Sequence, residues 1–110
     1  MTEFHVEMSG EARANVTAIY DWIAASSPSG ASRWLVAFEQ AISRLERLPL
    51  SYGLAPESEY APYELRQIMF KTRRGHVYRA VYFVAGDVVK ITHVRGQRQR
   101  LIPVSEFDDQ

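Results

Sequence analysis

The feature that most constrains the fold of this chain is a single change of hydrophobic period along its length. Between residues 11 and 48, apolar side chains recur at three- and four-residue spacing, which is the pattern of amphipathic helices. Between residues 65 and 94, the sequence is rich in Val, Ile, Tyr and Phe, which favour strands. Helices followed by a run of strands predict an α+β fold, with the helices packed on one face of a sheet.

Short local signals divide the first half into elements. Residues 4–8 alternate between apolar and polar side chains, which predicts a short first strand. Ser9 is placed to cap the first helix, and Ser27 followed by Pro28 ends that helix and begins a second one. Because the link is so short, we expect the two helices to form an antiparallel hairpin that ends at Pro49.

The second half supplies the rest of the sheet, with strands predicted at residues 65–71, 77–84 and 88–94. Gly86, first in a two-residue loop with Asp87, permits the positive φ of a type II′ hairpin turn. The stretch from 49 to 62 has no period and is predicted to be a long surface loop. The predicted order is therefore β-α-α-β-β-β, with a helical hairpin packed on a mostly antiparallel sheet.

Length and composition limit the organisation and location of the protein. With 110 residues, the chain is expected to form a single domain over residues 1–110, in which about 103–110 is a flexible tail. It has no cysteine, which excludes disulfides and thiolate zinc sites and fits a reducing cytoplasm. There is no signal-peptide pattern, and no apolar run approaches the roughly 20 residues that span a bilayer. We therefore expect a cytoplasmic protein.

Ionisable side chains give no sign of a metal or cofactor site. His5, His76 and His93 lack the spacing of a zinc site and have no paired acidic ligands near them. The carboxylates form no convergent pair, and no glycine-rich phosphate loop is present. We expect neither a metal nor a cofactor.

Charge is unevenly distributed, although the formal net charge is zero. Between residues 64 and 100 only two acidic residues accompany nine basic ones, which are Arg66, Lys71, Arg73, Arg74, Arg79, Lys90, Arg95, Arg98 and Arg100. Such a segregated field suits an anionic partner at one end of the molecule, either nucleic acid or an acidic peptide. The alternative is a solvated face of a neutral protein.

A two-residue turn would fix the register of the last two strands. Tyr82 would then lie opposite Ile91, Ala80 opposite His93, and Arg79 opposite Val94. The face predicted to meet the helices carries Tyr78, Ala80, Tyr82, Val84, Val89, Ile91, His93 and Arg95. The open face carries Arg79, Val81, Phe83, Val88, Lys90, Thr92 and Val94.

This assignment gives His93 and Arg79 different roles. His93 would point toward the core, where a structural, hydrogen-bonded role is expected instead of a catalytic one. Arg79 would share the open face with Lys90 and could bind phosphate or carboxylate bidentately, which makes it the best functional candidate. A three-residue turn would swap the faces of one strand and place His93 beside Arg79.

Two further features have both a functional and a structural interpretation. The segment Arg73-Arg74-Gly75-His76 could be an anion-binding loop or a solvated turn. Trp22 and Trp34 could anchor a partner, as aromatic residues often do, or pack in the core. Core packing is expected for Trp34, which lies on the apolar stripe of its helix, whereas Trp22 lies at the margin of its stripe.

Nearly the whole chain resembles the RelE/ParE toxin superfamily, and particularly its ParE-like branch. The matching runs are EARANVTAIYDWIAASSPSGASRWLVAFEQAISRLERLP and VYRAVYFVAGDVVKITHVRGQR. Within them, several features occur in the order and spacing found in the family. They are the Ala and Ile-Tyr positions of the first helix, the Pro after the second helix, the Tyr78-Arg79-x-x-Tyr82 strand and the His-Val-Arg ending of the last strand. The resemblance implies a compact α+β fold, a cognate antitoxin and a growth-inhibiting role in plasmid or chromosomal stabilisation modules.

The resemblance implies two different activities. RelE-like members cleave messenger RNA in the ribosomal A site, whereas ParE-like members inhibit DNA gyrase and are not nucleases. For a nuclease, the resemblance carries charge stabilisation over to Arg79, with Lys90 and Arg95 as further donors and His93 as the proton-transfer candidate. This chain departs from that pattern because no tyrosine follows Tyr82, and its pI of about 6.8 is neutral.

The long paired helices and these departures favour a gyrase-inhibiting toxin. The alternatives are a ribosome-dependent endonuclease and a toxin-derived domain that keeps only antitoxin binding. The antitoxin is expected to be acidic and partly disordered alone. The residues expected to bind the target or the antitoxin are Trp22, Arg66, Arg73, Arg74, Arg79, Lys90, Arg95 and Arg98.

Overall fold

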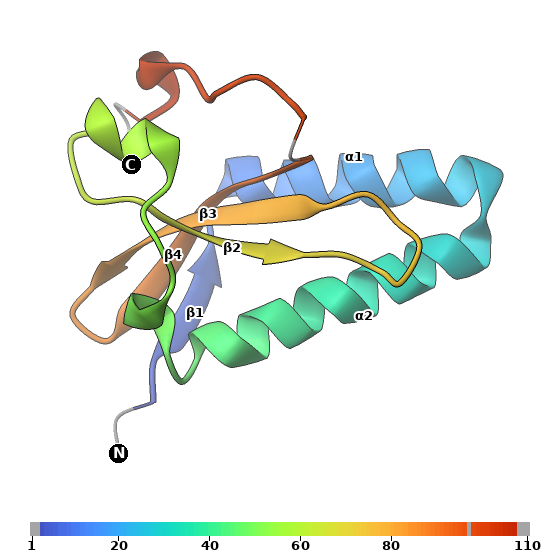
Figure 1. Cartoon of the computed structure of the whole chain (residues 1–110), viewed down its shortest axis with the longest axis horizontal. Coiled ribbons are helices and arrows are strands. Elements are labelled where there is room, and N and C mark those ends of the chain that lie inside the picture. The colour runs from blue at the N-terminus through green and yellow to red at the C-terminus, as the bar shows by residue number, and fades with distance from the viewer. Residues whose placement is uncertain (1–2, 97, 108–110) are drawn as a thin grey trace.

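The computed structural model describes residues 3–96 and 98–107 and has the predicted α+β architecture (Figure 1). The helices and strands, in chain order, are β1 (His5–Met8), α1 (Gly10–Ser26), α2 (Pro28–Leu45), β2 (Arg66–Phe70), β3 (Tyr78–Ala85) and β4 (Val88–Gly96). The described residues also contain three short 3-10 helices, namely η1 (Pro49–Ser51), η2 (Pro56–Glu59) and η3 (Val104–Phe107). Neither α-helix is long and apolar enough to cross a membrane.

Serine caps set the ends of the two helices, as predicted. The Ser9 hydroxyl accepts a hydrogen bond of 3.0 Å from the backbone N–H of Ala12 at the start of α1. The Ser27 hydroxyl accepts one of 3.0 Å from the N–H of Gly30 at the start of α2, where Pro28 occupies the first turn. Because Ser27 also ends α1, the helices turn back on each other after a single residue and form the expected hairpin.

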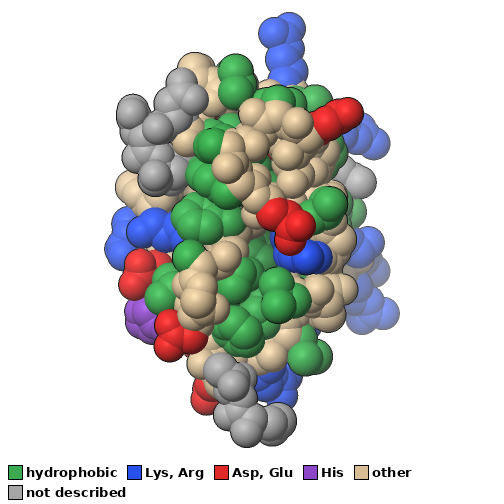
Figure 2. Space-filling view, turned by 90° about the vertical axis from the view of Figure 1, so that its left-hand side faces the viewer, with side chains coloured by type: hydrophobic (Ala, Val, Ile, Leu, Met, Phe, Trp, Pro, Cys, Tyr) green, Lys and Arg blue, Asp and Glu red, His purple; other side chains and the backbone are tan. Residues whose placement is uncertain are grey.

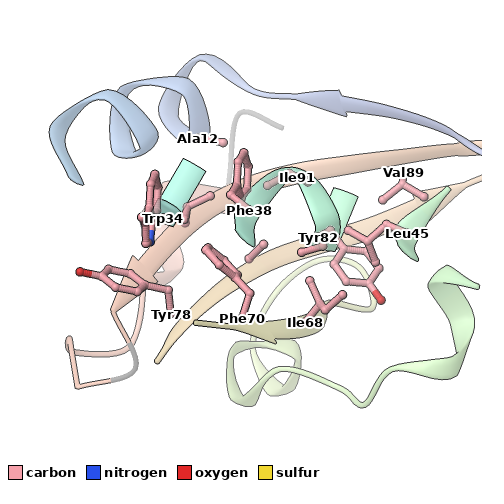
Figure 3. Close-up of a cluster of buried hydrophobic side chains, with 13 residues drawn as sticks. Ala12, Trp34, Phe38, Leu45, Ile68, Phe70, Tyr78, Tyr82, Val89 and Ile91 are labelled. Carbon is pink, nitrogen blue, oxygen red and sulfur yellow. The ribbon is translucent and has the colours of Figure 1, made fainter. Parts of the chain in front are cut away.

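The four strands form one mixed sheet in the order β1-β4-β3-β2, and the hairpin covers one face of it (Figure 1). β1 pairs parallel with β4, whereas β3 pairs antiparallel with both β4 and β2. A cluster of aromatic rings from α2 and the strands fills the space between hairpin and sheet (Figure 3). At its centre, Trp34 stacks on Phe38 with ring centroids 5.9 Å apart, and Phe70 packs against both.

The turn between β3 and β4 is the predicted two-residue turn, but a bulge farther along changes the register. Gly86 has a φ of 62°, and Tyr82 pairs with Ile91 as expected. Beyond that pair the register shifts by one residue at Thr92, so that Val81 pairs with His93. One extra residue on one strand turns every following side chain to the other face.

The predicted pairs beyond the bulge are therefore wrong. Ala80 lies opposite Val94 and not His93, and Arg79 lies opposite Arg95 and not Val94. Val94 joins the face that meets the helices, whereas His93 and Arg95 belong to the face predicted to be open.

Side chains of α1 and its cap hydrogen-bond to the irregular backbone at the bulge. The Ser9 hydroxyl donates to the Thr92 carbonyl over 2.9 Å, and the Ser9 N–H donates to the carbonyl of Ile91. The Asn15 side-chain carbonyl accepts from the N–H of Val94 over 3.0 Å. The bulge is therefore stabilised from the helical side of the sheet, through contacts that no local sequence pattern encodes.

The second face of the sheet is not open but carries a core of its own. Its buried side chains are Ala55, Leu65, Val81, Ile102 and Phe107. The stretch from 49 to 62 is thus only partly a surface loop, because it contains η1 and η2 and buries Ala55 and Glu57. The predicted tail is wrong for η3, whose Phe107 is buried, while residues 108–110 lie outside the described residues.

Candidate functional site

Arg79, the best functional candidate from the sequence, is buried in an ion pair. Its side chain comes from β3 and is 4% exposed, whereas the sequence placed it on an open face. Its Nη1 and Nη2 donate to the two carboxylate oxygens of Glu57 over 2.8 and 2.5 Å, and Nη1 also donates to the Gln67 side chain. The bidentate ligand that the guanidinium was expected to take from a partner is thus supplied by η2 of the same chain.

Glu57 is held as an anion by this arrangement. Burial by itself would raise the pKa of Glu57, but hydrogen bonds from Arg79 and from the N–H of Ile102, together with the Arg79 charge, lower the pKa from 4.5 to about 2. The contact with Ile102 ties the C-terminal segment to the same pair. The buried pair therefore joins three separate parts of the chain: β3, η2 and the segment after β4.

His93 is buried and hydrogen-bonded, as expected, but on the face opposite to the one predicted. Its Nδ1 lies 3.0 Å from the Thr92 hydroxyl and its Nε2 lies 2.9 Å from a carboxylate oxygen of Glu106. Burial lowers the pKa of His93, and the hydrogen bond and charge of Glu106 offset part of this effect. The Phe107 ring packs edge-on against the imidazole. These contacts favour a structural role.

The two remaining candidates for a nuclease lie on the same face. Arg95 is partly buried opposite Arg79, and its Nε has no hydrogen-bond partner within the described parts of the chain. Lys90 is partly exposed and lies 3.4 Å from a carboxylate oxygen of Glu7. The structure thus groups all four nuclease candidates on one face, but the C-terminal segment and η2 cover Arg79 and His93.

Arg66 lies apart from the other basic candidates. Its guanidinium donates to the Tyr52 carbonyl over 2.6 Å and pairs with Glu64 at 2.9 Å. These contacts hold the edge strand β2 to the preceding segment. The Arg66 side chain is only partly exposed, so little of its guanidinium is open to a partner.

The remaining candidates converge on a cleft beside the tip of the helical hairpin, at the right-hand end of Figure 1. Two adjoining hollows of about 690 and 570 Å³ lie between the α1–α2 junction, the β2–β3 turn and the end of β4. Both are lined by Trp22, Gly75, His76 and Tyr78, and together we call them the tip cleft. Arg73 and Arg74 line the second hollow and Arg98 lines the first, so four sequence-predicted residues meet here.

Arg33 also lines the cleft and had not been singled out as a binding group, whereas Trp34 had been considered as a partner anchor but was expected to pack in the core. Arg33 lies one turn into α2, and only the position of the hairpin tip brings it beside the β2–β3 turn. Trp34 is buried in the core as expected, yet its indole Nε1 has no hydrogen-bond partner among the described residues. Figure 3 shows Tyr78 at the edge of the same aromatic cluster, with its hydroxyl pointing away from it.

The described residues contain no group of three or more side chains suited to hold a metal ion. The sequence-predicted residues thus fall mainly into two places: a closed, paired arginine on one face of the sheet and a basic, aromatic cleft at one end of the molecule. The second is suited to bind a macromolecule because charged and apolar groups meet there and no described segment covers them.

Comparison with known proteins identifies the family. The sequence model described as the ParE toxin of the type II toxin–antitoxin system, parDE, matches residues 6–101. The chain belongs to the ParE toxin family. The comparison with curated proteins gave no match.

Solved structures with the same fold include two toxin–antitoxin assemblies. One is the chromosomal ParDE system from P. aeruginosa, at 18% identity and a TM-score of 0.67, covering 86% of this chain and 96% of that one. Another is the toxin–antitoxin complex RelBE2 from Mycobacterium tuberculosis, at 23% identity and a TM-score of 0.51, covering 87% of this chain and all of that one. Both likenesses show the fold that this ParE family member shares with them.

Proposed function

We propose that this ParE family toxin arrests growth by binding DNA gyrase in the cytoplasm, as part of a plasmid- or chromosome-stabilising module, and that a cognate antitoxin neutralises it. The observation that carries this proposal is the buried Arg79–Glu57 pair. It removes from the surface the arginine on which phosphate chemistry would depend. An activity based on binding a protein target fits better than RNA cleavage.

The argument against cleavage is one of geometry and charge. A guanidinium stabilises a scissile phosphate only when its donors face the place where negative charge develops. In this chain, the Arg79 donors already bind Glu57 and Gln67. Pulling the arginine out would leave Glu57 buried and unpaired, which costs about 3–5 kcal/mol. The ribosome-dependent endonuclease is thus the second candidate, supported only by the grouping of Lys90, His93 and Arg95 near Arg79.

The antitoxin part of the proposal has independent support. The matching family is described as the toxin of a two-component system, and both solved structures named above are toxin–antitoxin assemblies. An acidic partner would complement the basic residues gathered at the tip cleft.

The experiment is induced expression in a bacterial host, with and without the antitoxin, combined with two assays. The purified toxin should block gyrase supercoiling, and primer extension should find no in-frame A-site cuts in messenger RNA from arrested cells. Normal supercoiling at excess toxin would refute the gyrase target. A-site cuts that disappear in Lys90→Ala and Arg95→Ala variants would establish the nuclease instead, and no arrest would indicate a relative that only binds the antitoxin.

A further inference from the structure

The tip cleft carries charge of a single sign. Arg33, Arg73 and Arg74 line one hollow and Arg98 lines the other, and none of the described lining residues is acidic. The opposite end of the molecule is different, because acidic and basic side chains lie together there around hydrophobic ones (Figure 2). The field at the tip therefore attracts a negatively charged partner, although net charge is zero over the chain.

An exposed aromatic side chain stands between the two hollows. Trp22, on the last turns of α1, is 69% exposed and lines both of them, beside Tyr78. An indole on this scale of exposure is typical of residues that anchor protein interfaces. Because the two hollows are open to solvent and share Trp22 and Tyr78 in their lining, a length of chain can occupy them together.

A buried donor without an acceptor marks the same place. Trp34 is 2% exposed, lines the hollow next to Arg33 and leaves its indole N–H without a hydrogen-bond partner among the described residues. Buried polar groups are nearly always paired, and this N–H lacks, within the part of the chain that the structure describes, an acceptor that a bound chain can supply once the wall of the hollow shifts to admit it. A carbonyl or carboxylate oxygen of a bound chain meets this requirement.

We propose that the tip cleft binds an acidic, amphipathic segment of the cognate antitoxin. An apolar side chain of that segment packs on Trp22 and Tyr78, its carboxylates face Arg73 and Arg74, and one of its oxygens accepts the Trp34 N–H. This inference rests on the proposed function, which supplies the antitoxin. The antitoxin is favoured over the cellular target because a partner made together with the toxin keeps a largely exposed indole covered.

The first test measures binding of the purified antitoxin to the intact toxin by calorimetry. Trp22→Ala should weaken binding by about 30-fold or more, because it removes a central aromatic anchor. The matched control is Leu48→Ala. Leu48 is also a largely exposed hydrophobic residue, at 64%, but it lies outside the cleft. Arg74→Glu should weaken binding by about tenfold at low salt and by less at high salt, whereas Arg47→Glu, an exposed control outside the cleft, should not.

The second test follows the Trp34 indole N–H directly by NMR. Antitoxin binding should move its ¹H–¹⁵N signal downfield as it gains an acceptor, and Trp34→Phe should remove that signal and weaken binding. A Trp34 signal that does not move would contradict the hydrogen bond, and cleft variants that bind antitoxin like the wild type would overturn the whole inference.

Two other outcomes separate this inference from the proposed function. Cleft variants that bind antitoxin normally but no longer arrest growth would assign the cleft to the cellular target and overturn its assignment to the antitoxin. Failure of the wild-type toxin to bind the antitoxin at all would overturn the proposed function, and this inference with it. Tight wild-type binding that ignores every cleft substitution would overturn this inference alone.

Discussion

Glu57 decides what Arg79 can do. The sequence places Arg79 on a strand, which the structure confirms, and predicts that it binds an anion of a partner, whereas in the structure it binds a carboxylate of its own chain. The sequence could not reveal the anion, because Glu57 lies 22 residues earlier in a stretch with no hydrophobic period. Pairings of this kind depend on how a loop folds over the sheet, and local patterns contain no information about that.

Loss of the Glu57 carboxylate should destabilise the protein strongly. Glu57→Gln leaves the Arg79 charge buried without its counter-ion, which lowers the free energy of unfolding by about 3–5 kcal/mol in urea denaturation at pH 7. The double variant Glu57→Leu/Arg79→Met removes both charges and should recover most of the loss. Equal stability of Glu57→Gln and the wild type would contradict the pairing.

The same pair should produce a pH dependence in acid. The folded-state pKa of Glu57 is about 2 and its ordinary value is 4.5, so its contribution is complete above pH 4.5 and is lost as the pH falls toward 2. Unfolding curves should therefore converge for the wild type and Glu57→Gln as the pH falls through this range. A stability difference that stays constant from pH 7 to pH 2 would refute the shift.

His93 should make the protein sensitive to pH in a higher range. Because burial lowers its pKa below 6.5, the folded state favours the neutral ring, and its contribution is complete above pH 6.5 and is lost as the pH falls through the folded-state pKa. Thermal unfolding below pH 6.5 should show this loss in the wild type but not in His93→Gln. His76→Gln, on the exposed β2–β3 turn, is the matched control and should keep the wild-type profile.

At the scale of elements, local chemistry predicted some features and missed others. The serine caps, the Pro28 start of α2 and the Gly86 turn were all predicted, because each depends on residues adjacent in the chain. The bulge at Thr92 was missed because its backbone groups are satisfied by Ser9 and Asn15, far away in the sequence. The error in register followed from that omission alone.

Ser9 should contribute more to stability than an ordinary helix cap. Its hydroxyl both caps α1 and donates to the Thr92 carbonyl, so Ser9→Ala should lower the free energy of unfolding by about 1–2 kcal/mol. Ser27→Ala removes only a cap contact and should cost about 1 kcal/mol. Chemical denaturation of both variants makes the comparison, and a larger loss for Ser27→Ala would contradict the role of Ser9 at the bulge.

At the scale of the whole molecule, the sheet lies between two cores of different origin. The helical hairpin supplies the first, which the periodicity of the sequence predicted correctly. The second depends on the segments before β2 and after β4, whose few apolar residues show no regular spacing. Its main effect is to cover Arg79 on the face that was expected to be open. The convergence of Trp22 with the arginines of the tip cleft was likewise beyond sequence patterns, since it needs the folded hairpin.

The second core should be necessary for stability. Phe107→Ala removes a ring that is 1% exposed and should lower the free energy of unfolding by about 3–5 kcal/mol. Val104→Ala, in the same 3-10 helix but half-exposed, should change it by less than about 0.5 kcal/mol. Differential scanning calorimetry distinguishes the two, and a neutral Phe107→Ala would mean that the C-terminal segment does not belong to the folded core.

The bulge in β4 also affects how relatives can be compared with this chain. The extra residue at the bulge decides which of His93, Val94 and Arg95 face the helices. A relative that lacks this extra residue can keep the same His-Val-Arg sequence and still have each of the three side chains on the opposite face of the sheet. A relative can therefore match the His-Val-Arg ending column by column and still present different chemistry. Before a residue's role is transferred from one family member to another, the position of the bulge in the two strands must therefore be compared, and the amino acids at the aligned positions only after that.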